Sequence, residues 1–416
     1  MAFGESECAR CRDEFPALGR TLDGTPLAFF DGPAGTQLPR VVIDAVASYY
    51  ATCNANTHGQ FVTSRESDAM LAAARDAVAA FLGARSWREV SFGANMTSLA
   101  YALARTFARR FGPGDEVVIT ALDHEANRGP WLTLMERGVT VREVALRRDG
   151  TLDPDDMARR VGPRTRLLAI GYASNALGTV NDLALARRLA REAGAWLLVD
   201  AVHAAPHFPI DFAALDADFL LCSAYKFYAP HVGILLARPG LLDELEPDRL
   251  RTQDQAAPYR IETGTANHAA IAGVKAAVEY LASWGAGGSL RERLVGAMEA
   301  IAAWEHALAR RYFDALRAAP GVTVWGPDFA SPRRAPTVSI TIDGMTATEA
   351  ARLLGEQGLL VWDGHFYAVR AMEALGLDAR GGVLRAGMSM YTTPSEVDRL
   401  AGAVAALAAP RNDRFR

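Results

Sequence analysis

The stretch WLLVD, residues 196–200, decides the fold together with FLLCS, residues 219–223, which is followed closely by Lys226. Both are short, continuous apolar runs, and such runs are typical of strands that are buried on both faces of a parallel sheet. Ligands of open α/β sheets bind at the carboxyl ends of the strands. We therefore expect Asp200, which ends the first run, and Lys226 to face one crevice.

A buried lysine and a nearby carboxylate are the pair that pyridoxal 5'-phosphate (PLP) requires. The lysine forms a Schiff base with this cofactor, and the acid keeps the pyridine nitrogen protonated so that the ring can accept electrons. An amine beside apolar residues also loses hydration, which lowers its pKa and favours the nucleophilic form. Taken alone, Lys226 and Asp200 are equally compatible with a surface lysine and an ordinary strand-end aspartate.

The composition indicates a globular protein whose partner is a small molecule. The chain has 416 residues, of which 50% are hydrophobic, and this is enough for one large core and a second, smaller one. The formal net charge of −4 gives no basic surface for nucleic acid and no anchor for a membrane. No apolar run is long enough to span a membrane, and MAFGE at the amino end lacks the features of a signal peptide. We expect a cytoplasmic location.

The four cysteines predict neither a disulfide framework nor a metal site. They are few and scattered, and CARC, residues 8–11, has no second pair to complete a zinc site. His203 and His207 have the spacing of two ligands on one helical turn, but Pro206 would break that helix. We expect no bound metal, and we expect the end that carries Cys8 and Cys11 to be mobile or incidental.

Strand-like and helical patterns alternate along most of the chain, as a doubly wound sheet requires. Helices are predicted at residues 68–82, 97–111 and 183–193, between strands predicted at residues 90–92, 116–120, 139–141, 167–170, 196–200, 219–222 and 233–236. The glycine-rich stretch WGAGG, residues 284–288, ends this alternation. Ser289 and Glu292 then have the spacing of a capping box that opens a long helix.

The residues after this boundary follow a different pattern. Strands are predicted at residues 336–342 and 358–362, and helices are predicted to begin at Thr346 and Thr393, each of which has a glutamate three residues later. The expected fold class is therefore α/β. It has a large domain with a mostly parallel, doubly wound sheet at residues 31–288 and a small α+β domain at residues 289–416. We expect residues 1–30 to pack with the small domain.

Seven short stretches occur in an order that is typical of one family. They are DGPAGTQ (31–37), DHEAN (123–127), SNALGT (174–179), DAVH (200–203), SAYK (223–226), ETGT (262–265) and LRA (384–386). In these stretches, which extend over nearly the whole chain, the protein resembles the fold-type I PLP enzymes of aminotransferase class V, and among them the cysteine desulfurase-like proteins. The resemblance implies that the cofactor is PLP.

The resemblance implies that four side chains contact the cofactor ring and its substituents. Lys226 would form the Schiff base, and Asp200 would contact the pyridine nitrogen. His124 would stack on the ring and place a titratable group near the reacting carbon. His203 stands where family members often carry glutamine, and it would hydrogen-bond the phenolic oxygen of the cofactor. Lys226, His124 and Asp200 are the expected catalytic residues.

The cofactor phosphate needs hydrogen-bond donors, and residues 93–98 lie between a predicted strand and a predicted helix. Free backbone N–H groups and the helix dipole favour an anion at such a turn. Asn95 and Met96 would hold the phosphate by their backbone, and Ser223 would add a hydroxyl. Thr265 would add another from a second subunit, because the family forms dimers. We therefore expect a homodimer with shared active sites.

Arg385 is the expected partner of the α-carboxylate of an amino-acid substrate, because a guanidinium matches a carboxylate with two parallel hydrogen bonds. Asn175 would help from the large domain. Asn56 and His365 complete the expected substrate-binding set.

The chain departs from the resembled family at one loop. Desulfurases that accept sulfur as a persulfide carry a cysteine in a stretch similar to Gly-His-His-Cys-Ala, whereas this chain has GHFYA, residues 364–368, with Tyr367 at the cysteine position. A phenol cannot form a persulfide, because that chemistry requires a thiolate. Of the other thiols, Cys222 is expected to be a buried apolar residue. Cys53 is a weak candidate near the expected site.

The expected function is a β-elimination on a cysteine-like or other small L-amino acid, through the Schiff base at Lys226. Such a carbon–sulfur lyase needs no catalytic cysteine. The alternatives are an aminotransferase or epimerase that uses the same lysine as a proton shuttle, and a desulfurase that works without the usual loop cysteine. A non-catalytic protein with a retained fold is disfavoured, because Lys226, Asp200, His124 and Arg385 are all present.

Overall fold

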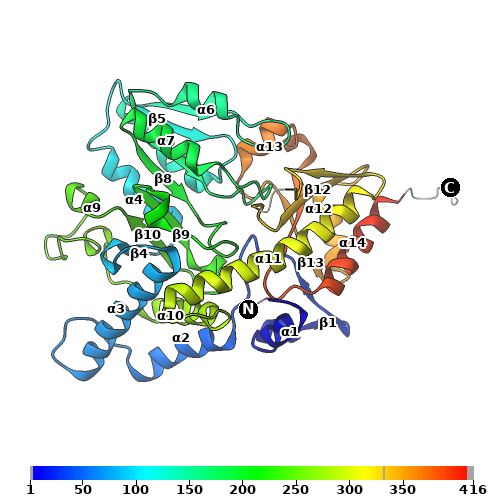
Figure 1. Cartoon of the computed structure of the whole chain (residues 1–416), viewed down its shortest axis with the longest axis horizontal. Helices are drawn as coiled ribbons and strands as arrows, with labels where there is room; N and C mark the ends of the chain where they lie inside the picture. Colours follow the sequence, from blue (N-terminus) through cyan, green and yellow to red (C-terminus); the bar gives the residue numbers. More distant parts are fainter. Residues whose placement is uncertain (1–2, 331–332, 410–416) are drawn as a thin grey trace.

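The computed structural model describes residues 3–330 and 333–409, and it shows two sheets with helices packed around them (Figure 1). Met1 and Ala2 of the amino end, and residues 410–416 at the end of the expected small domain, lie outside the described residues. In Figure 1, the larger sheet lies among the green and cyan elements, and the smaller sheet lies among the yellow and orange ones.

The larger sheet has seven strands in the order β4-β10-β9-β8-β7-β5-β6. The strands from β9 to β6 pair in parallel, and β10 runs antiparallel to both of its neighbours. The strands are β4 (Val90–Gly93), β5 (Glu116–Thr120), β6 (Thr140–Val144), β7 (Thr165–Gly171), β8 (Trp196–Asp200), β9 (Phe219–Ser223) and β10 (Gly233–Ala237). The prediction of a mostly parallel α/β sheet is confirmed, and only the strand expected at residues 139–141 is displaced, to Thr140–Val144.

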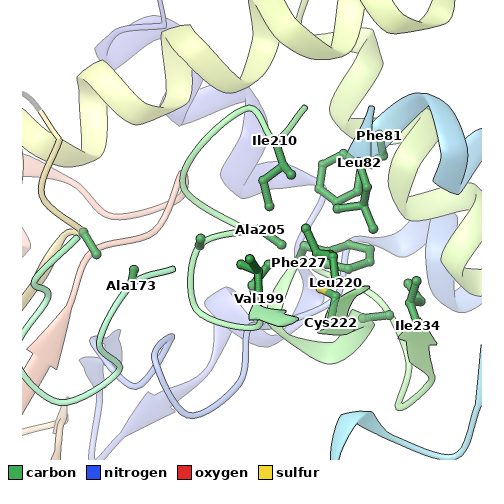
Figure 2. Packing of buried hydrophobic residues seen from close by; sticks show 14 of the residues in the cluster. Phe81, Leu82, Ala173, Val199, Ala205, Ile210, Leu220, Cys222, Phe227 and Ile234 are labelled. Atoms are coloured by element: carbon green, nitrogen blue, oxygen red, sulfur yellow. The ribbon is translucent and has the colours of Figure 1, made fainter. Parts of the chain in front are cut away.

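The apolar runs are continuous because helices cover both faces of this sheet. Leu198 and Leu221 belong to the apolar cluster on the side of α4 (Met96–Phe107). Their neighbours Val199 and Leu220 point to the other side, where they pack near Phe227 (Figure 2). Alternate residues of one strand thus enter two different cores, as strand geometry requires.

Helices of the large sheet begin and end at the residues that physical rules favour. α7 (Leu183–Ala193) begins after Asp182, whose side chain accepts a hydrogen bond from the Leu185 N–H, and ends at Gly194, which has a left-handed φ of 68°. The helix predicted at residues 68–82 begins earlier, as α3 (Val62–Leu82), and the helix predicted at 97–111 is α4. The others are α2 (Arg40–Thr52), α5 (Gly129–Leu132), α6 (Pro154–Arg160), α8 (Phe212–Leu215), α9 (Leu241–Glu244) and α10 (His268–Ser283).

A long helix, α11 (Leu290–Arg317), connects the two sheets (Figure 1). The capping box predicted at Ser289 and Glu292 is present at its beginning. α11 contacts α3 and α10 beside the larger sheet, and also contacts α14 (Pro394–Ala408) beside the smaller one. This helix therefore fixes the position of one sheet relative to the other.

The smaller sheet is antiparallel, with the strand order β11-β12-β15-β14. Its elements are β11 (Val322–Trp325), β12 (Thr337–Ile342), β14 (Trp362–Gly364) and β15 (Val383–Gly387), with helices α12 (Ala347–Gly355), α13 (Val369–Leu375) and α14. The strand predicted at residues 358–362 is wrong, because this stretch divides into two strands. The first, β13 (Leu359–Leu360), pairs in parallel with β3 (Ala28–Phe29) near the amino end, and only the second, β14, joins the sheet.

The amino-terminal segment is folded, which corrects the expectation of a mobile or incidental end. Cys8 and Cys11 lie on the buried face of α1 (Glu5–Asp13). Arg12 on the same helix donates to the backbone oxygen of Tyr391 and forms an ion pair with Glu396 at 2.9 Å. A short hairpin of β1 (Thr21–Leu22) and β2 (Thr25–Pro26) follows. The buried face of α1 was missed because its partners, Tyr280 next to Cys11 and Thr392 next to Cys8, are distant in the chain.

Within residues 3–330 and 333–409, no helix is both long and apolar enough to cross a membrane.

Candidate active site

A cavity lies at the carboxyl ends of the parallel strands β5, β7, β8 and β9. This is the edge where open α/β sheets bind their ligands. Seven of the predicted residues line it, namely Met96, His124, Asn175, Asp200, His203, Ser223 and Lys226. The sequence prediction that Asp200 and Lys226 share one crevice is therefore correct.

Lys226 and Asp200 are both buried, and each is close enough to affect the pKa of the other. Burial, reinforced by the positive charge of Arg385, lowers the pKa of Lys226 to about 7. Burial raises the pKa of Asp200 to about 6, although the Val202 N–H donates to its carboxylate at 2.9 Å. The Lys226 amine donates to the backbone oxygen of Pro33. The site thus holds an amine with a substantial neutral fraction near pH 7 beside a carboxylate.

His124 lies on the loop after β5 and is held in one tautomer. Its Nδ1 accepts a hydrogen bond from the Ala126 N–H at 2.9 Å. Burial, followed by the charge of Lys226, lowers the pKa of His124 to about 4. The imidazole is therefore neutral near pH 7, and because Nδ1 is an acceptor its single proton is on Nε2.

His203 contacts the small sheet, which the sequence did not predict. Its Nε2 lies 3.0 Å from the hydroxyl oxygen of Thr337 on β12, whereas its Nδ1 is buried without a hydrogen-bond partner. Burial holds the pKa of His203 well below its usual range. His207 does not join His203 around a common ligand, because its Nδ1 lies 2.7 Å from the buried carboxylate of Glu305. The unpartnered Nδ1 of His203 is available to a ligand in the cavity.

The amino end of α4 lies at one side of the cavity. Asn95 is the N-cap, and its side chain accepts from the Ser98 N–H at 2.9 Å. The Met96 N–H donates to the Ser223 hydroxyl oxygen at 3.0 Å, so these two predicted phosphate ligands bind each other. Thr97, which was not predicted, also lines the cavity. Free N–H groups and the helix dipole at this end suit a phosphate.

Arg385 lies on β15 of the small sheet, beside the cavity. It is buried, and its Nη1 donates to the backbone oxygen of Asn175 at 2.9 Å. Its guanidinium carbon lies 3.9 Å from the ring centre of Phe366, and its Nε has no partner. Burial lowers the pKa of Arg385 to about 9, against the opposing influence of Asp31. A buried cation with an unpaired donor suits a carboxylate ligand.

Five predicted site residues do not line the cavity. Asn95 and Arg385 lie next to it, as described above, whereas Asn56, His365 and Thr265 lie at the surface. Asn56 and His365 are exposed, and their side chains bond locally to backbone N–H groups. Thr265 is also exposed, after Gly264, whose φ is 86°. Asn56 and His365 remain predictions as substrate ligands, and Thr265 remains one as a ligand that acts from a second subunit.

Asp123 is a cavity residue to which sequence reasoning gave no role. It is buried three residues after the end of β5, and it accepts hydrogen bonds from the Gly171 N–H at 2.7 Å and the Asn127 side chain at 3.2 Å. Burial, together with the charge of Asp200, raises the pKa of Asp123 to about 7. A signal similar to the one that identified Asp200, an acid at the end of a mostly apolar run, could have found it.

The loop at residues 364–368 covers one side of the site. The Asn175 side chain donates to the Phe366 oxygen at 2.8 Å, and the Glu125 N–H donates to the Tyr367 oxygen at 2.8 Å. The Tyr367 ring lies 5.3 Å from the His124 ring. Among the residues that line the cavity in the described part of the chain there is no cysteine, and Cys222 is fully buried, as expected.

These features fit PLP. The cavity offers a buried amine, a carboxylate at a neighbouring strand end, an unpartnered imidazole nitrogen and a helix amino end for a phosphate. A mostly parallel α/β sheet with this set at its strand ends defines a fold-type I PLP enzyme.

Comparison with known proteins gives the family. The chain matches the family model described as aminotransferase class-V over residues 28–400. A cysteine desulfurase of Klebsiella pneumoniae subsp. pneumoniae is 36% identical over 406 residues, which cover 94% of this chain and 95% of that protein. A cysteine desulfurase of Serratia proteamaculans is 33% identical over 407 residues, covering 94% and 96%.

Comparison with solved structures supports the same family. The apo structure of a cysteine desulfurase from Thermococcus onnurineus has a TM-score of 0.86 and 26% identity, covering 96% of this chain and 98% of that one. The cysteine desulfurase CsdA of Escherichia coli has a TM-score of 0.83 and 30% identity, covering 95% and 97%. The chain belongs to the aminotransferase class V family, and the predicted cofactor, PLP, is confirmed.

Proposed function

We propose that this enzyme catalyses β-elimination on a small L-amino acid that carries sulfur at Cβ, releasing pyruvate, ammonia and a thiol. The observation that carries this proposal is the combination of the Lys226–Asp200 pair with a site loop that presents Tyr367 and no thiol. When bound, PLP accepts the electron pair that is left at the substrate's Cα. The rest of the chemistry falls to the side chains of this chain.

Lys226 and Asp200 have complementary tasks in this proposal. Lys226 attaches the cofactor. Once the substrate has displaced Lys226 from the cofactor, the Lys226 Nζ takes the proton from Cα. The pKa of about 7 makes this amine a competent base at neutral pH. Asp200 keeps a proton at the pyridine nitrogen. His203 Nδ1 and the amino end of α4, with Asn95, Met96, Thr97 and Ser223, hold the polar groups of the cofactor.

Arg385 and Asn175 orient the substrate. The guanidinium takes the α-carboxylate. The Asn175 backbone oxygen and the Phe366 ring hold that guanidinium in place, and the Asn175 side-chain amide holds the covering loop. Because these groups come from both sheets, they enclose the reacting atoms and limit the access of water.

Desulfuration is the second candidate, because relatives that are 33–36% identical over 94% of the chain are named cysteine desulfurases. That reaction delivers the sulfur to a thiol and leaves alanine. Cys53 is a poor acceptor, because it is half-buried, its thiol donates to the Thr63 oxygen at 3.2 Å, and it does not line the cavity.

The test is a product analysis on cystine and S-substituted cysteines. Elimination yields pyruvate, ammonia and the thiol compound in equal amounts, without a keto-acid co-substrate. An aminotransferase instead needs a keto acid and returns its amino acid, and an epimerase changes only the configuration at Cα. Either of those two outcomes, without pyruvate, would contradict the proposal.

We also propose a homodimer in which Thr265 serves the partner's phosphate site, because Thr265 is exposed and does not line the cavity of its own chain. Thr265→Ala chains should bind PLP more weakly. In a mixed dimer of one Thr265→Ala chain and one Lys226→Ala chain, one site should bind PLP with normal affinity. This is the cavity of the Thr265→Ala chain, because it has its own Lys226 and receives an intact Thr265 from the Lys226→Ala chain. If mixing restores nothing, Thr265 does not act across an interface.

A further inference from the structure

Two consecutive residues of the loop at residues 364–368 have a strained backbone conformation. Phe366 has a φ of 52° and Tyr367 a φ of 58°, in the left-handed region that bulky residues rarely adopt. Such a conformation is unfavourable for a bulky residue, and it persists only where the surroundings impose it. The conformation therefore needs a structural reason.

Hydrogen bonds from the large sheet impose this conformation. The Asn175 side chain donates to the Phe366 oxygen and the Glu125 N–H donates to the Tyr367 oxygen, each at 2.8 Å. On the other side, the Tyr367 N–H donates to Nδ1 of His365 at 3.0 Å. The backbone of Tyr367 is thus fixed from both directions.

Ion pairs hold the helix that follows the loop. Arg370 on α13 pairs with Glu143 on β6 at 2.9 Å, and Glu143 also pairs with Arg128 at 2.8 Å. Arg128 in turn pairs with Glu125, the residue whose N–H binds the loop, at 3.1 Å. A network of this kind fixes the loop against the large sheet more firmly than a single exposed pair could.

The fixed backbone places the Tyr367 ring beside His124, a residue that lines the cavity. The Tyr367 ring lies 5.3 Å from the ring of His124, at an angle of 33°. It is also close enough to Tyr225, another cavity residue, to influence the pKa of that phenol. The Tyr367 side chain is 66% exposed, so solvent can return a proton to it.

We propose that Tyr367 is the acid that protonates the departing sulfur; this rests on the β-elimination proposed above. The Cβ–S bond breaks, its electron pair stays on sulfur, and the sulfur takes the proton from the Tyr367 hydroxyl. Water then reprotonates the phenolate. The proton taken from Cα stays on Lys226, so the two proton transfers use different groups.

The neighbouring groups are less suited to this task. His124 is neutral near pH 7, and the remaining N–H of a neutral imidazole is a much weaker acid than a phenol, whose pKa is about 10. Burial raises the pKa of Tyr225 above its usual value, which makes it a weaker acid than a phenol in water. Tyr367 is the exposed phenol beside the cavity.

The test compares two leaving groups in Tyr367→Phe. Chloride leaves β-chloroalanine without a proton, whereas an alkyl thiolate benefits from one. We expect kcat/KM for pyruvate release from S-methylcysteine to fall by about 100-fold, in the range of general acid catalysis, and that for β-chloroalanine to stay within about threefold. Bound PLP and its absorbance should be unchanged. Across a series of S-substituted cysteines, the rate of Tyr367→Phe should depend more steeply than the wild-type rate on the pKa of the released thiol.

Two further variants control the comparison. Tyr50→Phe, at an exposed tyrosine on α2 that does not line the cavity, should change neither rate. Tyr367→His should recover part of the lost rate on S-methylcysteine below about pH 6.5, because histidine tolerates a left-handed φ and is then protonated.

Three results would overturn the proposal. Equal losses on both substrates mean that Tyr367 only shapes the site, and no loss on S-methylcysteine means that another group, such as Lys226, supplies the proton. A wild-type enzyme that releases pyruvate from β-chloroalanine but from no S-substituted cysteine contradicts the proposed function itself, and the role of Tyr367 falls with it.

Discussion

The floor and the roof of the cavity differ in origin and in character. The floor consists of Lys226, Asp200 and His124, which lie at or after the ends of strands of the larger sheet; Lys226 and Asp200 are buried, and His124 is half-buried. The roof is the loop at residues 364–368, which belongs to the small sheet and carries the exposed Tyr367. The sequence predicts the floor through its resemblance to aminotransferase class V, and it predicts a departure from the desulfurase pattern at Tyr367 of the roof.

This difference indicates a division of labour. Groups at the rigid ends of strands keep the perturbed pKa values that cofactor chemistry needs, because the packing of the sheet keeps these groups buried. A loop at the rim can change its side chains without disturbing that burial. We infer that the floor makes the chain a PLP enzyme and that the roof decides where the sulfur goes. The predictions below test each half of this inference.

The largest effect is expected for Lys226→Ala. Without the amine, no group of the floor can take the Cα proton, and activity should fall by about 10⁴-fold. The measurement is pyruvate release at saturating substrate, with bound PLP determined on the same sample. Residual activity within tenfold of wild type would show that another base acts.

Asp200→Asn should have the next largest effect. The amide can still accept the Val202 N–H, but it cannot hold a proton at the pyridine nitrogen through a negative charge. We expect kcat to fall by about 10²- to 10³-fold while PLP remains bound. Asp200→Glu, which keeps the carboxylate, should retain more activity than the amide. Equal losses in the two variants would mean that shape, and not charge, matters here.

Arg385→Lys should raise KM by about 10- to 100-fold, with a smaller change in kcat. Lysine keeps the charge but loses the paired hydrogen bonds to the substrate carboxylate and the contact with Phe366. The control is an amine substrate that lacks the carboxylate. The wild-type enzyme and Arg385→Lys should process this amine equally poorly. If the variant discriminates against it as strongly as wild type does, Arg385 is not the carboxylate ligand.

The pH dependence of cofactor attachment should give the smallest effect. Only the neutral amine attacks the PLP aldehyde, and the pKa of Lys226 is lowered from 10.5 to about 7. The attachment rate of the apoprotein should therefore rise about tenfold per pH unit below 7 and level off above it. Mixing apoprotein with PLP and following absorbance measures this rate, with a free alkyl amine as the reference. A rise that continues to pH 10 would show a lysine with an ordinary pKa.

The floor was predictable from the sequence, and parts of the rest were not. Asp200 and Lys226 each follow a continuous apolar run, and such runs report burial directly. The contact of His203 with Thr337 and the pairing of β13 with β3 join residues that are distant in the chain, and no local pattern encodes them. Asp123 carried a signal similar to that of Asp200 but received no role. The left-handed conformation of Phe366 and Tyr367 is imposed by hydrogen bonds from another sheet, so residue type did not reveal it.

The most direct test of the account is the fate of L-cysteine in the wild-type enzyme, measured with an added thiol present. If the floor acts as proposed and the roof supplies no sulfur acceptor, cysteine gives pyruvate, ammonia and sulfide in equal amounts. Alanine in place of pyruvate, with the sulfur carried away as a persulfide, would contradict the account.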